Sequence, residues 1–134
     1  MTETPPLGLL LLDGSYERVH YGLAMAASAL AVNRPAVLFF TNGALLALAG
    51  PQDWRRLGGG AEAADAARRA AGVAGIEELF EACAALGARF IACEMGLRSI
   101  GLQANDLRAD IAVEVAGLVT FYNALPAGAQ PSVL

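Results

Sequence analysis

Apolar runs of two kinds alternate along this chain. Short, unbroken runs occupy residues 7–13 ("LGLLLLD"), 35–40 ("PAVLFF") and 88–93 ("ARFIAC"), and such runs are typical of strands covered on both faces. Longer segments, from Ser15 to the "NRP" sequence and over 76–87, repeat apolar residues at helical spacing. Strands that alternate with helices predict an α/β fold, with three layers (α/β/α) around a mainly parallel sheet.

The remaining apolar segments predict shorter elements. "ALLALAG" (44–50) indicates a short helix, and "MGLRSIGL" (95–102) indicates a short helix or turn. We expect a last helix over about 113–125 and one short final strand within "AQPSVL" (129–134).

The segment 51–74 differs in composition from its surroundings. It combines a glycine triplet at 58–60 with an alanine-rich amphipathic piece, and it lacks strong apolar periodicity. We therefore expect a mobile excursion that is partly helical, with disorder at the glycine triplet.

The composition favours a single domain over residues 1–134. Hydrophobic residues make up 56% of the 134 residues and charged residues only 16%, which is enough for one real core. So few charges on so small a domain also leave apolar surface to bury between subunits. We therefore expect a homo-oligomer.

Charge and terminal sequence argue against several protein classes. The net charge of −4 and the scattered arginines disfavour a nucleic-acid partner, because phosphate binding needs a basic stripe. "MTETPP" lacks the features of a secretory signal, so a cytoplasmic protein is expected. The longest apolar stretches fall short of the ~18–20 residues of a spanning helix, so no membrane span is expected.

The two cysteines, Cys83 and Cys93, are expected to be free thiols rather than a disulfide framework. One histidine and two dispersed cysteines give no metal-ligand spacing, and no G-x-G-x-x-G or Walker pattern occurs. Neither a metal nor a cofactor is therefore predicted. Cys83 lies on the apolar stripe of the 76–87 helix, and we interpret it as a packing residue.

Asp13, Thr41 and Cys93 stand where the predicted strands end. In open parallel sheets, ligands and reactive groups gather at the carboxyl ends of the strands. Thr41 is followed by Asn42, a turn residue that can free the backbone at this edge.

Cys93 is the strongest candidate for chemistry. The segment after it can start a helix, whose dipole and backbone N–H groups, those of Met95 and Gly96, can stabilise a thiolate. We expect this thiol to be open at the rim of the sheet. The competing interpretation is a small buried apolar residue that ends a strand, since free cysteine is among the most buried residue types.

Two other residues bear on this choice. Glu94 opposes a low thiol pKa if its carboxylate points inward, although adjacent residues of an extended chain face opposite ways. His20 lies early in the first predicted helix and can supply a proton or a charge to Cys93. An exposed helical histidine without a role at the thiol is the favoured interpretation.

Three stretches carry a family resemblance: FFT followed by a glycine at 39–43, A-C-x-M at 92–95, and "VEVAGLVTF" at 113–121. With these motifs the chain resembles the DsrE/DsrF-like family of small sulfur-relay proteins over about residues 7–125. The resemblance implies an α/β/α domain that assembles as trimers or hexamers. It also implies that a cysteine, here Cys93, accepts sulfane sulfur as a persulfide and passes it between donor and acceptor proteins.

Three functions stay open from the sequence. The leading hypothesis is a sulfur carrier or sulfurtransferase subunit that forms a persulfide on Cys93. The alternative is a non-catalytic module that binds a small ligand or serves assembly, with an inert cysteine. A thiol peroxidase is the weakest hypothesis, because no resolving cysteine is well placed and no arginine is fixed next to Cys93 by spacing, Arg98 being the nearest that follows the thiol.

Overall fold

One sheet positions every other element of the fold. The computed structural model describes residues 4–134, and in them five strands, all parallel, pair in the order β4-β3-β2-β1-β5. The strands are β1 (Leu7–Leu11), β2 (Ala36–Phe40), β3 (Arg89–Cys93), β4 (Val113–Ala116) and β5 (Ser132–Val133). The three long strands and the short final strand expected from the sequence are confirmed.

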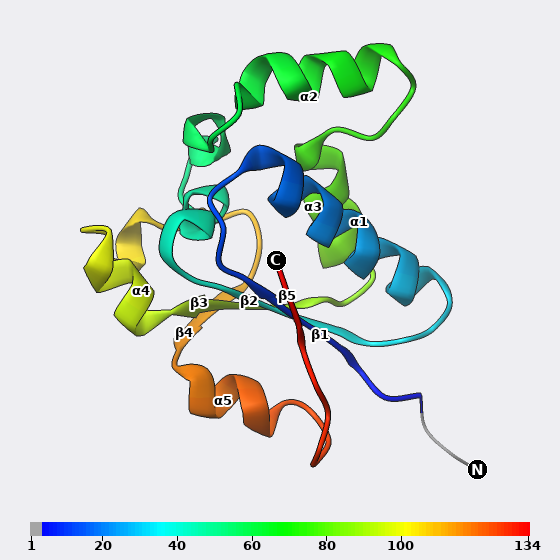
Figure 1. The fold of residues 1–134 in the computed structure, drawn as a ribbon, viewed down its shortest axis with the longest axis vertical. Coiled ribbons are helices and arrows are strands. Elements are labelled where there is room, and N and C mark those ends of the chain that lie inside the picture. The colour runs from blue at the N-terminus through cyan, green and yellow to red at the C-terminus, as the bar shows by residue number, and fades with distance from the viewer. Residues whose placement is uncertain (1–3) are drawn as a thin grey trace.

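Helices cover both faces of this sheet. The α-helices are α1 (Tyr16–Ala31), α2 (Ala61–Ala70), α3 (Ile76–Ala85), α4 (Glu94–Ser99) and α5 (Leu118–Asn123), and the 3-10 helices are η1 (Asn42–Ala47), η2 (Asp53–Arg56) and η3 (Ala104–Asp106). Figure 1 shows α1, α2 and α3 on one side of the sheet and α5 on the other. The predicted three-layer arrangement is confirmed, with outer layers of unequal size. None of the helices described is long and apolar enough to cross a membrane.

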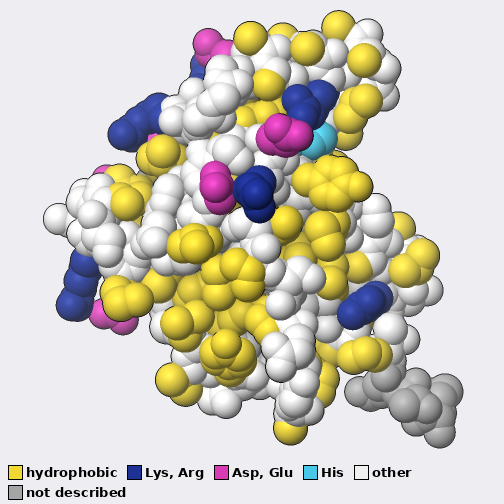
Figure 2. All heavy atoms as spheres, viewed as in Figure 1, with side chains coloured by type: hydrophobic (Ala, Val, Ile, Leu, Met, Phe, Trp, Pro, Cys, Tyr) yellow, Lys and Arg dark blue, Asp and Glu magenta, His cyan; other side chains and the backbone are white. Residues whose placement is uncertain are grey.

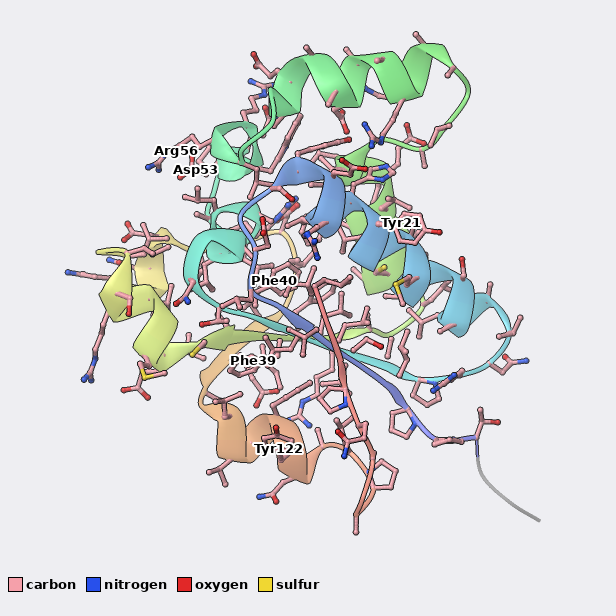
Figure 3. All side chains as sticks on the ribbon, in the orientation of Figure 1. Tyr21, Phe39, Phe40, Asp53, Arg56 and Tyr122 are labelled. Atoms are coloured by element: carbon pink, nitrogen blue, oxygen red, sulfur yellow. The ribbon has the colours of Figure 1, made fainter. Side chains whose placement is uncertain are left out.

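Strand β2 shows why both faces must be covered. All five of its residues are buried, and successive side chains of a strand point to opposite faces. Phe40 packs toward Phe80 of α3, with ring centroids 6.3 Å apart, whereas Phe39 packs toward Phe121 of α5 at 5.1 Å. Figure 3 shows Phe39 on the α5 side of the strand and Phe40 on the other side. The sheet therefore separates two apolar clusters.

The helix predicted over 113–125 is wrong in its first part. Val113–Ala116 form β4 and pair in parallel with β3, and the helix begins only at Leu118. The alternating β-branched valines of "VEVA" favour a strand, and Gly117 separates that strand from the helix.

The segment 51–74 contains η2 and α2, and it packs onto the fold through four buried residues, two of which are Trp54 and Asp65. Trp54 of η2 lies beside Tyr16 of α1, with ring centroids 6.2 Å apart. Asp65 of α2 accepts hydrogen bonds from the Tyr16 hydroxyl and from the backbone N–H of Ile76. These contacts tie α2 to α1 and α3. The mobility expected for this segment stays a prediction.

Candidate functional site

The carboxyl ends of the central strands bring part of the predicted site together. β2 pairs with β3 so that Phe40 lies opposite Ala92, and one residue further the same register places Thr41 opposite Cys93. On the other side of β3, Ala116 of β4 lies opposite Cys93. Cys93 therefore occupies the middle of a row of three residues at this edge of the sheet.

Helix α4 begins directly at the thiol. Cys93 is the N-cap residue of α4, and its Sγ accepts a hydrogen bond from the backbone N–H of Gly96 at 3.3 Å. A Cβ on Gly96 would lie 2.5 Å from Oγ1 of Thr41 and 2.9 Å from the backbone nitrogen of Asn42. Only a glycine lets α4 approach the end of β2 this closely, so this packing places the N–H donor at the sulfur.

The thiol itself is not open. Cys93 is 2% exposed, so the expectation of an accessible thiol at the rim is wrong. Its side chain points to the face of the sheet that α5 covers, where it joins a cluster with Phe39 and Ile91 of the sheet and with Phe121 and Leu125. The direction of the side chain, rather than the position of the residue along the strand, determines its burial.

The two residues that follow the thiol face solvent. Glu94 is exposed, and its carboxylate accepts a hydrogen bond from Arg98 at 3.0 Å. Met95 is 67% exposed. The carboxylate of Glu94 is therefore engaged on the outer surface of α4, and the unfavourable inward orientation considered from the sequence does not occur.

His20 and Asp13 serve other parts of the fold. His20 is 6% exposed and its Nε2 lies 2.8 Å from the carbonyl oxygen of Ala74, so the expected exposed histidine is wrong. The connection between α2 and α3 covers it, on the face of the sheet opposite Cys93. Asp13 is exposed and accepts a hydrogen bond from the backbone N–H of Ser15 at 2.8 Å, at the start of α1.

Most of the chain matches the sequence profile of one known family. The sequence profile of the DsrE/DsrF-like family matches residues 9–130. The chain belongs to the DsrE/DsrF-like family. The resemblance seen in the sequence motifs is therefore confirmed, and the match includes Cys93 and both of its neighbouring strands.

Two solved structures are similar to this DsrE/DsrF-like chain. One is MTH1491 from Methanobacterium thermoautotrophicum, a protein of unknown function, with 13% identity, a TM-score of 0.66, and coverage of 96% of this chain and 98% of that chain. The other is the YchN protein from E. coli, with 15% identity, a TM-score of 0.61, and coverage of 96% and 99%. At these identities the likeness shows the fold alone. No curated protein sequence matches the chain.

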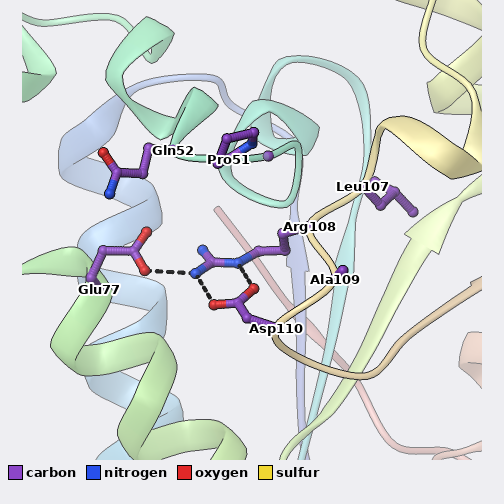
Figure 4. A pocket seen from close by; sticks show the side chains of 8 residues that line it. Pro51, Gln52, Glu77, Leu107, Arg108, Ala109 and Asp110 are labelled. Atoms are coloured by element: carbon purple, nitrogen blue, oxygen red, sulfur yellow. Dashed lines mark hydrogen bonds and ion pairs between the residues drawn. The ribbon is translucent and has the colours of Figure 1, made fainter.

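Arg108 forms a buried cluster on the face of the sheet opposite Cys93. This cluster was not predicted from the sequence. The Arg108 side chain is 7% exposed, lies 4.5 Å from the centroid of the Phe80 ring, and donates hydrogen bonds to Glu77 at 2.6 Å and Asp110 at 2.7 Å (Figure 4). Burial alone would lower the pKa of Arg108, but the two carboxylates raise it above its ordinary value. The cluster ties the chain before β4 to α3.

A cavity of about 420 Å³ adjoins this cluster and is lined in part by Pro51, Gln52 and Glu77. Oε1 of Glu77 is buried there without a hydrogen-bond partner among the residues described. Because Phe80 belongs to the cluster under α1 and α3, whereas Cys93 belongs to the cluster under α5, the cavity is separate from the thiol.

Proposed function

We propose that this protein is a small sulfur-relay protein that carries sulfane sulfur as a persulfide on Cys93. The observation that supports the proposal is the placement of this thiol in a DsrE/DsrF-like chain: it ends a central strand, caps α4 and accepts the N–H of Gly96. A backbone donor held at the sulfur can hydrogen-bond to the anionic sulfur that attacks and leaves in each transfer step.

The proposed chemistry needs no cofactor, because thiol-persulfide exchange is redox-neutral overall. The Cys93 thiolate attacks the terminal sulfur of a donor persulfide, a new S–S bond forms on Cys93, and the donor leaves as a thiolate. In the second step an acceptor thiolate attacks the terminal sulfur on Cys93. The S–S bond to Cys93 breaks, Cys93 leaves as a thiolate, and the persulfide is now on the acceptor.

Intact-protein mass spectrometry after incubation with inorganic polysulfide tests this proposal. We expect the wild-type chain and Cys83→Ser to gain the mass of one sulfur atom, and Cys93→Ser to gain none. Cys83→Ser is the matched control, because Cys83 is also a buried free thiol, on α3. Equal loading of Cys93→Ser, or an unchanged mass in the wild type, would refute the carrier function.

The alternative function, a ligand-binding or assembly module with an inert cysteine, is favoured by one specific observation. Cys93 is 2% exposed, which fits a residue that only packs. If polysulfide leaves Cys93 unmodified while the chain keeps its fold and its assembly state, this alternative replaces the carrier function.

We also propose that the chain forms a homo-oligomer, a trimer or a hexamer, through the outer surface of α5. Leu118, Val119 and Tyr122 are 40%, 74% and 56% exposed, and we call these three residues the α5 patch. Figure 2 shows apolar side chains gathered over the part of the surface where Figure 1 places α5. Apolar patches of this kind commonly mark contacts between subunits.

A further inference from the structure

The burial of Cys93 conflicts with a carrier function unless part of its cover moves. Phe39 and Ile91, which pack beside the thiol, belong to β2 and β3, and each of these strands pairs with a neighbour on both sides. Such a strand cannot leave the sheet without breaking two hydrogen-bonded ladders. Phe121, by contrast, belongs to α5, and Leu125, just after α5, packs over Gly8 of β1. The movable part of the cover is therefore the segment 118–125.

Helix α5 is held to the sheet by few contacts. It has six residues, of which only Phe121 is buried, and Leu125 just beyond it is 8% exposed. On the other face, α1 has 16 residues, six of them buried. A helix as short as α5 has little stability of its own, and segments with few buried apolar contacts open before the rest of a fold.

We infer that α5 is a lid over Cys93: in a protomer whose α5 patch is not covered by another subunit, the segment 118–125 lifts from the sheet and exposes the thiol while the remaining elements stay folded. Phe121 holds the lid shut, because its ring packs on Phe39 with centroids 5.1 Å apart. The purpose of this opening, which is to give sulfur donors and acceptors access to Cys93, rests on the proposed function. The opening itself is measured without any sulfur chemistry.

The test is the rate at which iodoacetamide alkylates each cysteine in dissociated protein, obtained by dilution or with Val119→Asp in the α5 patch. The rates are read from peptide mass spectra at several urea concentrations below the unfolding transition. Cys83 is the internal reference, because it is fully buried under α1 and burial raises its pKa to about 11. We expect Cys93 to react faster than Cys83, with a rate that depends less steeply on urea, because lifting α5 exposes less surface than unfolding. Phe121→Ala is expected to raise the Cys93 rate by about tenfold or more.

Phe80→Leu is the matched control, since it weakens the apolar cluster on the opposite face of the sheet. With a lid, Phe80→Leu speeds alkylation of Cys83 and leaves the rate at Cys93 unchanged. If the alkylation rates of both cysteines depend on urea in the same way and both rise in Phe80→Leu, Cys93 is reached only by global unfolding. That result would overturn the lid. If Cys93 is alkylated through local opening but takes up no sulfur, the lid is supported and the carrier function fails.

Discussion

The hydroxyl of Tyr16 is a single group on which the attachment of α2 depends. It donates a hydrogen bond to the carboxylate of Asp65, which is 4% exposed and also accepts from the backbone N–H of Ile76 at 2.7 Å and from Arg69 at 3.2 Å. Tyr16→Phe removes this hydroxyl and keeps the ring, so the packing of the ring beside Trp54 is preserved.

The expected cost follows from the charge and burial of the acceptor. A hydrogen bond to a charged group contributes about 1.5–3 kcal/mol to stability. Asp65 keeps two of its donors in Tyr16→Phe, so the carboxylate is not left unpaired, and the cost lies in the lower part of this range. We predict that Tyr16→Phe lowers the free energy of unfolding by about 1.5–2 kcal/mol.

Urea denaturation at neutral pH and fixed protein concentration measures this change. Tyr21→Phe is the matched control, because Tyr21 lies on the same helix and is 65% exposed. The control is expected to stay within about 0.5 kcal/mol of the wild type. A Tyr16→Phe chain as stable as the Tyr21→Phe chain would refute the reasoning.

The pH dependence of the same pair gives an independent check. Burial alone would raise the pKa of Asp65, but the hydrogen bonds from Tyr16, Ile76 and Arg69 together lower it below its ordinary value. A carboxyl whose pKa is lower in the folded state stabilises the fold fully above its unfolded pKa, and this contribution is lost as pH falls through the folded pKa. The difference in the free energy of unfolding between the wild type and Tyr16→Phe should therefore be largest near neutral pH and should shrink below about pH 4.

Three further changes test the packing of the site, the arginine cluster and the assembly. Gly96→Ala is expected to lower the free energy of unfolding by about 1–3 kcal/mol and to slow sulfur loading of Cys93, because the new Cβ would meet Thr41. Gly58→Ala, where the nearest atom is 3.7 Å away, is its control, and equal stability of the two variants would contradict the account. Arg108→Met is expected to lower the free energy of unfolding by about 1–3 kcal/mol, less than for a fully buried pair because its partners are partly exposed. Arg98→Met breaks an exposed ion pair and should lower the free energy of unfolding by no more than about 1 kcal/mol. Equal losses of stability in Arg108→Met and Arg98→Met would show that the burial of Arg108 does not matter. Val119→Asp in the α5 patch is expected to dissociate the oligomer in sedimentation velocity, with the exposed Val32→Asp as control. A wild-type monomer at micromolar concentration would contradict the assembly.

The strands could be predicted because each central strand is an unbroken apolar run bounded by turn residues, as at 35–40. The segment 113–125 could not be divided correctly by pattern alone. Its apolar residues fit both a strand and a helix, and pairing with β3 decides in favour of a strand at Val113–Ala116. Tertiary pairing, which a single sequence does not display, made that choice.

For the site, the position of Cys93 at the strand end and a backbone donor after it followed from the sequence. The burial of its thiol did not, because it depends on which face of the sheet the side chain meets and on the cover that α5 provides. His20 is covered by Ala74, 54 residues away, and Arg108 meets Glu77, 31 residues away. Contacts of such long range leave no local signal in the sequence.

The most direct test of sulfur carriage follows one peptide through a complete transfer. The peptide that contains Cys93 is examined by mass spectrometry after exposure to polysulfide and again after addition of a small acceptor thiol. We predict that this peptide first carries one additional sulfur and then returns to its original mass as the acceptor becomes a persulfide. A peptide that stays unmodified throughout, although iodoacetamide reaches the same cysteine in the folded chain, would contradict the account.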